Sequence, residues 1–297
     1  MNTFDTSPPR LTGIQCMVLS ALSFSLMSLT VKMAGQRIPV MELVFARAAV
    51  VTALAGADLA RRRVALWDRQ APLLLARGLV GFVALSLFYY SVVHLPLAEA
   101  TVLHFTNPVF TAVIAALFLG EALRPREFGL ALASLAGVVV MVRPAGLLGA
   151  GTPLPPLPVA SSLAASLLAA VAYVIVRHMR RLDAMLIVFH FAAISVIGAA
   201  PLMLRSFVMP HGTEWAVLAG VGVSTFFGQL FLTLGLQRER AGRATTAGYL
   251  QIVFAATWGA LVFGDLPGPH TILGAAIIVA CTHLLARLRE APPAEEG

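Results

Sequence analysis

Charged residues are scarce in this sequence. Only 12% of its 297 residues are Asp, Glu, Lys or Arg, whereas 59% are hydrophobic and the mean hydropathy is +0.86. A soluble globular domain carries roughly 25% charged residues, and it needs them to cover its surface in water. The composition therefore excludes an ordinary soluble protein and predicts an integral membrane protein whose outer surface contacts the lipid bilayer.

Cysteines are few, and the familiar nucleotide-binding and catalytic motifs are absent. Cys16 and Cys281 fall inside apolar runs without a CxxC spacing, so we expect neither a disulfide framework nor a structural zinc site. The sequence contains no P-loop, HExxH, GxSxG or Rossmann fingerprint. We therefore predict no cofactor, no enzyme activity and no ATP-driven pump.

Long apolar runs fill most of the sequence. A helix needs about 20 apolar residues to cross a bilayer. The first run begins at Leu11 and is long enough to span, so we interpret it as a transmembrane helix and not as a signal peptide. The predicted fold class is all-α and polytopic, with ten transmembrane helices. They are expected at 11–33, 40–59, 72–93, 98–119, 128–142, 159–178, 184–204, 215–236, 243–263 and 271–288.

The two halves of the sequence are related by a constant shift of 144 residues, the offset between Glu121 and Asp265. At this shift Ala-Thr at 100–101 meets Ala-Thr at 244–245, and Val-Phe at 109–110 meets Val-Phe at 253–254. The stretch between the halves is rich in Pro and Gly, as linkers are. We therefore predict a first five-helix repeat at 1–143, a linker at 144–158 and a second, inverted five-helix repeat at 159–297.

The distribution of basic residues agrees with an inversion. Each predicted repeat has an odd number of spans, so the second copy must cross the membrane in the opposite sense. Lys and Arg favour cytoplasmic loops. The arginine cluster at 61–69 corresponds to a loop with Arg205 alone, whereas the basic loop at 238–243 corresponds to one without Lys or Arg. The net charge of +7 thus reflects topology and predicts no nucleic-acid partner. We expect a multi-pass protein of the cell inner membrane with both termini in the cytoplasm.

Polar side chains recur at helical spacing in the fourth and ninth predicted spans. Because polar groups are costly in lipid, we expect Asn107 and its counterpart Gln251 to face a substrate cavity near the membrane midplane. Pro108 removes a backbone donor, so a kink should leave a carbonyl free for a ligand. The alternative is that the two amides only bond neighbouring helices. The two matched stripes are Thr101, His104, Asn107 and Thr111, and Thr245, Gly248, Gln251 and Ala255.

Further side chains are candidates for the same cavity. His104 is one of the few titratable groups inside a span, and its role is a coupling proton, a substrate hydrogen bond or a structural hydrogen bond. His190 is a second such histidine. Aromatic and amide walls suit a flat or amphipathic solute, although Tyr and Trp also anchor helices at the interface. The remaining candidates are Tyr89, Tyr90, Tyr173, Gln229, Tyr249 and Trp258.

Charged and small residues give three further hypotheses. Glu42 and Arg47 lie five apart in the second span, close enough for a loose ion pair or for partners on neighbouring helices. The functional alternative is an anion contact or a gate charge, and the structural one is an interfacial Glu42 with Arg47 bonded to backbone or snorkelling. Glu121 and Asp265 follow glycines at matched span ends, where capping and topology explain them. Small residues at 129, 133 and 137 form a stripe for a close helix contact or for a homodimer.

Five segments carry a resemblance to a known family. They are FSLMSLTVKM at 24–33, VFAR at 44–47, LARGLVGF at 75–82, LFYYSVVHLPLAEATVLHFTNPVFTAVIAALFLGEAL at 87–123 and LQRERAGRATTAGYLQIVFAATWGALVFGD at 236–265. Together they resemble the drug/metabolite transporter superfamily in its ten-helix EamA group. The resemblance covers essentially the whole chain and implies alternating access by two five-helix bundles, without ATP. It implies a cavity lined mainly by the first, third, fourth, sixth, eighth and ninth helices, with the family's arginine at Arg47. The sequence departs from the pattern at Ile252, which stands where the first repeat has Pro108, so we expect a kink in one repeat only.

The predicted function is secondary transport of a small organic metabolite, with export as the first choice. Proton exchange or the solute's own gradient is the expected driving force. The alternative is uptake of a scavenged metabolite such as S-adenosylmethionine or riboflavin. A membrane-embedded enzyme would need a compact acid/base or metal cluster, which we do not find, and a channel is disfavoured by the inverted repeat.

Overall fold

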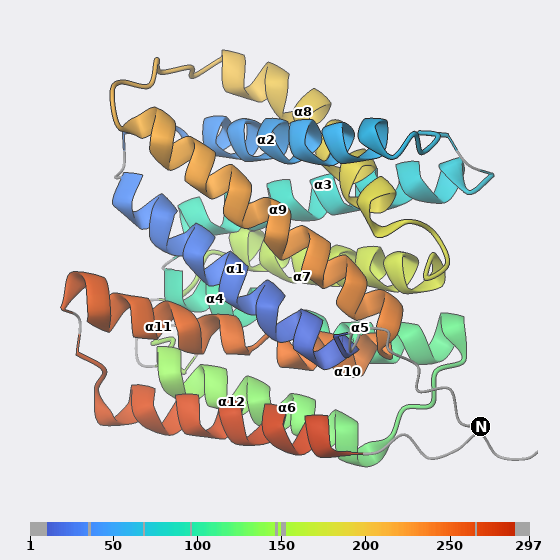
Figure 1. Ribbon diagram of the computed structural model, residues 1–297. Helices are drawn as coiled ribbons and strands as arrows, with labels where there is room; N and C mark the ends of the chain where they lie inside the picture. Colours follow the sequence, from blue (N-terminus) through green and yellow to red (C-terminus); the bar gives the residue numbers. More distant parts are fainter. Residues whose placement is uncertain are drawn as a thin grey trace, which may run out of the picture.

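Twelve α-helices occur in the computed structural model, which describes residues 11–34, 37–67, 69–95, 97–145, 148–149, 153–264 and 266–288 (Figure 1). No strand occurs in these ranges, and Asp265 lies outside them. The helices are α1 (Gly13–Ala34), α2 (Val40–Arg61), α3 (Ala71–His94), α4 (Leu97–His104), α5 (Asn107–Leu119), α6 (Pro125–Val142), α7 (Pro156–His178), α8 (Ala184–Leu204), α9 (Glu214–Arg238), α10 (Ala241–Ala247), α11 (Leu250–Phe263) and α12 (Pro269–Arg287).

Ten segments of the described chain are long and apolar enough to cross a membrane, which confirms the predicted number of transmembrane helices. Four of them begin two or three residues earlier than the sequence suggested, and three of these four begin at a proline. These three begin at Pro125, Pro156 and Pro269, because proline is favoured in the first helical turn, where no N–H is needed. The last three residues of the predicted linker at 144–158 are therefore helical.

The fourth and ninth spans are each interrupted, α4 from α5 and α10 from α11, by two residues. In the ninth span the amides of Gly248 and Tyr249 bond to carbonyls three residues back, those of Thr245 and Thr246. A Cβ at Gly248 would lie 2.9 Å from the Thr245 carbonyl oxygen, so this tight turn requires glycine. The expectation of a kink in one repeat only is wrong, because glycine interrupts the second repeat where Pro108 interrupts the first.

The repeats pack as an inverted pair. α1 packs against α9, and their counterparts at the 144-residue shift, α7 and α3, pack against each other. α2 packs against its own counterpart α8, and α6 against α12, at opposite edges of the bundle (Figure 1). α2 and α8 are antiparallel, since Glu42 in the first turn of α2 meets Val208 beyond α8, and Arg62 beyond α2 meets Asp183 before α8. This arrangement confirms two inverted five-helix repeats.

Small residues bring α6 and α12 close together. A Cβ at Gly274 would lie 2.5 Å from the carbonyl oxygen of Gly137, so neither position accepts a larger side chain without a shift. Gly129, eight residues earlier on α6, has nothing within 4 Å of its Cβ position. The predicted small-residue stripe thus makes a close helix contact within the chain at Gly137, and the homodimer remains a prediction.

Candidate functional site

A cavity of about 840 Å³ lies between the two repeats. Its wall comes mainly from α1, α3, α4, α7 and α11. At one end the wall consists of buried side chains such as Met17 and Leu232. At the other end it includes Leu97 and Phe263, which are 67% and 39% exposed. This second end, where α4 begins and α11 ends, is named the open end below.

The interruption of the fourth span lies in the cavity wall, where His104 ends α4 and Asn107 begins α5. The carbonyl of His104, which Pro108 cannot satisfy, accepts hydrogen bonds from Asn107 Nδ2 at 2.9 Å and from Ser166 Oγ at 3.2 Å. The expectation of a carbonyl left free for a ligand is therefore wrong, because two side-chain donors satisfy it. Asn107 has already used one amide N–H in this bond.

The two predicted histidines differ in their surroundings. The His104 ring stacks on Phe88 with the ring centroids 4.2 Å apart, and its buried Nδ1 has no hydrogen-bond partner among the described residues. His190 lies outside the cavity wall, and its Nδ1 is 2.9 Å from the carbonyl oxygen of Leu186. His104 therefore has a nitrogen available to a solute, whereas His190 fits the structural alternative.

Most of the predicted site residues share this one wall. Gln251 lies beside the interruption of the ninth span. Trp258, two turns further along α11, donates from Nε1 to Ser25 Oγ of α1 at 3.0 Å. Their contact with a substrate stays a prediction. The candidates that line the cavity are His104, Asn107, Tyr89, Tyr173, Gln229, Gln251 and Trp258.

Tyr90 and Tyr249 do not line the cavity. Tyr90 is exposed, and its ring lies 4.2 Å from that of His94 on the same helix. Tyr249 is fully buried, with its ring centroid 5.8 Å from that of Phe105. Successive helical residues point roughly 100° apart, so Tyr89 faces the cavity while Tyr90 cannot.

Glu42 and Arg47 turn to different neighbours. Glu42 lies outside the cavity wall and accepts a hydrogen bond from the amide of Val208 at 3.0 Å. Arg47 lines the cavity, with Nη1 3.8 Å from Met27 Sδ and the guanidinium 5.9 Å from the centre of the Tyr89 ring. Arg47 thus contacts the neighbouring helices α1 and α3, whereas Glu42 contacts the segment after α8, and a role of either residue as a gate charge stays a prediction.

Sequence reasoning missed Arg77 of α3. This residue is 3% exposed and lines the cavity, with its guanidinium 4.3 Å from the centre of the Phe191 ring. A lone arginine well inside an apolar span was the available signal, because charge is costly there and marks function. It was passed over because its counterpart in the repeat is Val221, which is apolar.

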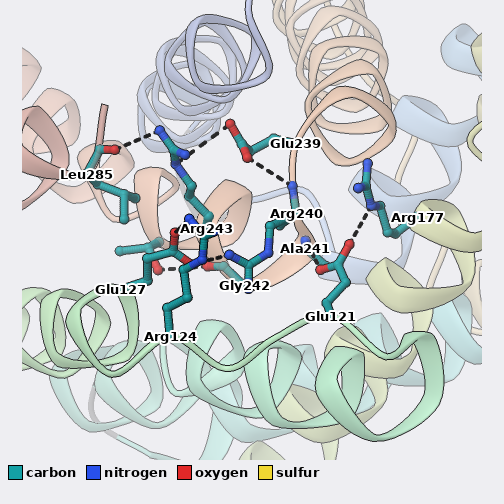
Figure 2. A network of polar contacts seen from close by, with 11 residues as sticks. Glu121, Arg124, Glu127, Arg177, Glu239, Arg240, Ala241, Gly242, Arg243 and Leu285 are labelled. Atoms are coloured by element: carbon teal, nitrogen blue, oxygen red, sulfur yellow. Dashed lines mark hydrogen bonds and ion pairs between the residues drawn. The ribbon is translucent and has the colours of Figure 1, made fainter. Parts of the chain in front are cut away.

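A network of charges lies where α5 ends and α10 begins, beyond the buried end of the cavity (Figure 2). Glu121, which follows α5, accepts hydrogen bonds from Arg177 Nε at 2.7 Å and from the Ala241 amide at 2.8 Å. Glu121 thus joins α5, α7 and α10, which is more than the capping role expected for it. This end is named the network end, and its charged residues are Glu121, Arg124, Glu127, Arg177, Glu239, Arg240 and Arg243.

The network also reaches the peripheral helices α6 and α12. Arg240 Nη1 donates to Glu127 at 2.8 Å, and Arg243 Nη2 donates to the carbonyl of Leu285 at 2.8 Å. Beneath these bonds a Cβ at Gly242 of α10 would lie 2.7 Å from the Cβ of Ala112 of α5. α5 and α10 therefore touch at the network end, whereas α4 and α11 border the cavity at the open end.

Known proteins share this architecture. The sequence profile of the EamA-like transporter family matches residues 11–143 and 157–287. The pseudopaline exporter of Pseudomonas aeruginosa is 34% identical over 94% of this chain and 97% of that protein. The S-adenosylmethionine uptake transporter of Rickettsia prowazekii is 25% identical over 69% of this chain and 68% of that protein. A crystal structure at 20% identity covers 93% of this chain and 96% of that chain with a TM-score of 0.80, which shows the shared fold.

Sequence and structure lead to one family. The two family matches fall on the two five-helix repeats, and the exporter is similar over almost the whole chain. The ten apolar spans surround a cavity that is open at one end and closed by charges at the other. The chain therefore belongs to the EamA-like transporter family of the drug/metabolite transporter superfamily, and it is a multi-pass membrane transporter of small molecules and not an enzyme.

Proposed function

We propose that this chain exports a small organic metabolite by alternating access, without ATP. The observation that carries the proposal is that the exposed end of the 840 Å³ cavity lies where α4 begins and α11 ends, while α5 and α10 are in contact at the opposite end. In alternating access one midplane site faces the two sides of the membrane in turn. A cavity of this volume accommodates a metabolite-sized solute.

In this proposal the network end faces the cytoplasm. The arginines at 61–63 and the basic loop at 238–243 belong to this end, and such residues favour cytoplasmic loops. Both termini then lie in the cytoplasm of a cell whose inner membrane holds the protein, and the cavity faces outward. The repeats extend over 1–143 and 159–297, with 144–158 as the linker.

The repeat indicates how the cavity changes sides. α5 touches α10 at the network end, while their counterparts, α11 and α4, border the cavity at the open end. If the two repeats exchange conformations, α4 meets α11 and α5 separates from α10. The ion pairs of the network then break once in each transport cycle.

We assign substrate binding to the side chains at the two interruptions. His104, Asn107 and Gln251 supply polar contacts there, and Tyr89, Tyr173, Gln229 and Trp258 surround them. No Asp or Glu lies in the described part of the cavity wall, so His104 is the proposed carrier if a proton is coupled. The solute's own gradient is the other driving force.

The similarity to the pseudopaline exporter supports the export direction. A binding screen tests the site first. A ligand that binds only the folded protein raises its melting temperature, because at a concentration of 100 times its Kd it adds about 2.7 kcal/mol to the free energy of unfolding. We expect metabolites that stabilise the purified wild type to lose this effect in Asn107→Leu and in Gln251→Leu. They should keep it in Tyr90→Leu, the matched control, because Tyr90 lies outside the cavity wall.

Direction is then measured in cells with the stabilising compound. Cells that express the wild type should contain less of it than cells that express Asn107→Leu. A higher content would establish uptake, as the similarity to the S-adenosylmethionine uptake transporter would favour. Equal contents would contradict transport of that compound, and a melting shift retained in Asn107→Leu would move the site away from the interruptions.

A further inference from the structure

Two buried arginines of the cavity wall, Arg47 and Arg77, form no ion pair with the residues that the structure describes. Lys32 also belongs to the wall, and no carboxylate does within the described ranges. The Lys32 ammonium lies 4.0 Å from the centre of the Phe263 ring, close to the open end. The two arginines lie deeper, and they are 7% and 3% exposed.

The Arg77 guanidinium is held without an ion pair. Its Nε and Nη1 are buried and have no hydrogen-bond partner in the described chain, while the group packs on the Phe191 ring. Gly81, one turn along α3, makes room for it, since a Cβ there would overlap Nη1 of Arg77. Gly81 and Phe191 therefore accommodate the Arg77 guanidinium, and its Nε and Nη1 donors make no hydrogen bond to the described residues.

Arg47 has equally weak partners. Its Nη1 reaches only the Met27 sulfur, at 3.8 Å, and sulfur is a weak acceptor. Its distance of 5.9 Å from the centre of the Tyr89 ring lies at the limit of a cation–π contact. Neither contact supplies a negative charge.

The network end shows that this chain pairs its arginines elsewhere. Arg177 bonds to Glu121 there, and Arg240 bonds to Glu127. A buried cation without a counter-charge is costly, and inside a membrane protein such a residue generally serves function. The missing counter-charge in the cavity is therefore best explained as belonging to the solute.

We propose that the transported metabolite is an organic anion, and that its carboxylate or phosphate group binds Arg77 and Arg47. A guanidinium presents donors in a planar fork that matches the oxygens of either group. The apolar or aromatic part of the solute packs against Phe88, Tyr89 and Trp258 of the same wall. This inference rests on the proposed transport site and adds the chemical class of its substrate.

A panel of matched acids and amides tests this inference, with indole-3-acetate and indole-3-acetamide as one pair and phenylacetate and phenylacetamide as another. We expect the acids to raise the melting temperature of the purified wild type more than the amides do. In Arg77→Gln the apparent affinity for the acids should fall at least about tenfold, because a charged hydrogen bond is lost. Arg205→Gln, which removes an exposed arginine, is the matched control.

Two further variants separate binding from folding. Gly81→Ala keeps the arginine but displaces its guanidinium, so it should also lower the apparent affinity for the acids. Gly129→Ala is the control, because its Cβ position is in free space and the affinity should not change. Without any anion, Arg77→Met should melt no lower than the wild type, because it removes an unpaired buried charge. A clear drop in its melting temperature would show that Arg77 has a structural role and would overturn the inference.

The other possible results of these measurements also bear on the anion inference. Amides that stabilise as well as acids, acids that do not stabilise the wild type, or an acid effect unchanged in Arg77→Gln would each overturn the anion inference. A neutral metabolite that stabilises the wild type but not Asn107→Leu would also overturn the anion inference, and it would still support the proposed transport site. Another outcome is an acid that stabilises the protein only when Arg77 is present, while its content in cells is the same with and without the protein. That outcome would support the anion site and contradict transport of that acid.

Discussion

At the network end Arg177 and Glu127 take part in ion pairs, whereas their counterparts in the other repeat, Met33 and Thr271, carry no charge and lie toward the open end. Arg124 likewise corresponds to Gly268. The two ends are therefore equivalent in backbone but not in chemistry. Charges join the helices at the network end, whereas three of the counterparts toward the open end, Met33, Gly268 and Thr271, are uncharged.

The edge formed by α2 and α8 differs, because charges clamp it at both ends. Arg62 donates to Asp183 at 2.6 Å at one end, and Arg37 donates through Nε to Glu214 at 2.7 Å at the other. Because α8 is the counterpart of α2, the packing of these two helices does not need to change when the repeats exchange conformations. Only the asymmetric contacts, those of α5 with α10 and their network, have to break.

The largest effect is expected from a larger side chain placed between α5 and α10 at the network end. Leucine in Gly242→Leu has no space, because even a Cβ lies 2.7 Å from the Cβ of Ala112. Overpacking costs about 1–3 kcal/mol, and 1.4 kcal/mol is tenfold in an equilibrium, so we expect about a tenfold shift away from the observed conformation. A cysteine introduced by Ala255→Cys in the cavity wall, with Cys16 and Cys281 replaced by Ala, reports this shift.

A membrane-impermeant maleimide should label that cysteine more slowly from the open-end side after Gly242→Leu, and faster from the network-end side. Gly129→Leu is the matched control, because nothing lies within 4 Å of its Cβ position. Equal labelling rates in Gly242→Leu and the wild type would show that the α5–α10 contact does not close the cavity.

A smaller effect is expected from Glu121→Gln. The Glu121 and Arg177 side chains are 14% and 13% exposed, and the substitution removes the negative charge beside the guanidinium, whose other acceptors are the backbone carbonyls of Leu236 and Gln237. Hydrogen bonds to charged groups contribute about 1.5–3 kcal/mol, so the melting temperature should fall and labelling should shift in the same direction as for Gly242→Leu. Adding Arg177→Gln should recover part of the loss. No recovery would mean that the two residues act independently.

The fold could be predicted from the sequence because lipid imposes a simple rule. Each span must be apolar over about 20 residues, and a constant shift reveals the repeat without any knowledge of packing. The helix interruptions were harder to predict. Pro108 indicates the first in the sequence, whereas the need for Gly248 at the second follows from a tight backbone contact that only the structure shows. The charge network was not predicted, since it joins residues from five helices whose proximity no local pattern encodes.

The candidate site was only partly predictable, for the same reason. Asn107 and Gln251 follow from the matched register, and the structure brings both to the cavity wall. Which face of a helix points inward depends on packing, so Tyr90 and Tyr249 were assigned to the wrong side. The counterpart of Arg77 in the repeat is the apolar Val221, so the matched register does not indicate it, and its lack of hydrogen-bond partners in the described chain is visible only in the structure.

The smallest expected effect concerns the α2–α8 edge and depends on pH. The hydrogen bonds from Arg62 lower the pKa of the Asp183 carboxyl below its usual value, so the folded pKa is lower than the unfolded one, about 3.9. The pair then stabilises the folded protein above pH 4 and loses this contribution as the pH falls through the folded pKa. The side chains are 39% and 30% exposed, which limits the contribution to about 1 kcal/mol or less.

Asp183→Asn isolates this pair, because asparagine still caps α8 by accepting the Met185 amide. The wild type should melt slightly above Asp183→Asn at pH 7, and the difference should shrink as the pH falls below 4 and through the folded pKa. A difference that stays constant over this range would assign the effect to the cap and not to the charge. Labelling of the Ala255→Cys reporter should be the same in both proteins, because this edge is clamped at both ends and keeps its contacts in either conformation. A shift in labelling would mean that the edge moves with the cavity helices and does not hold the frame around which they rearrange.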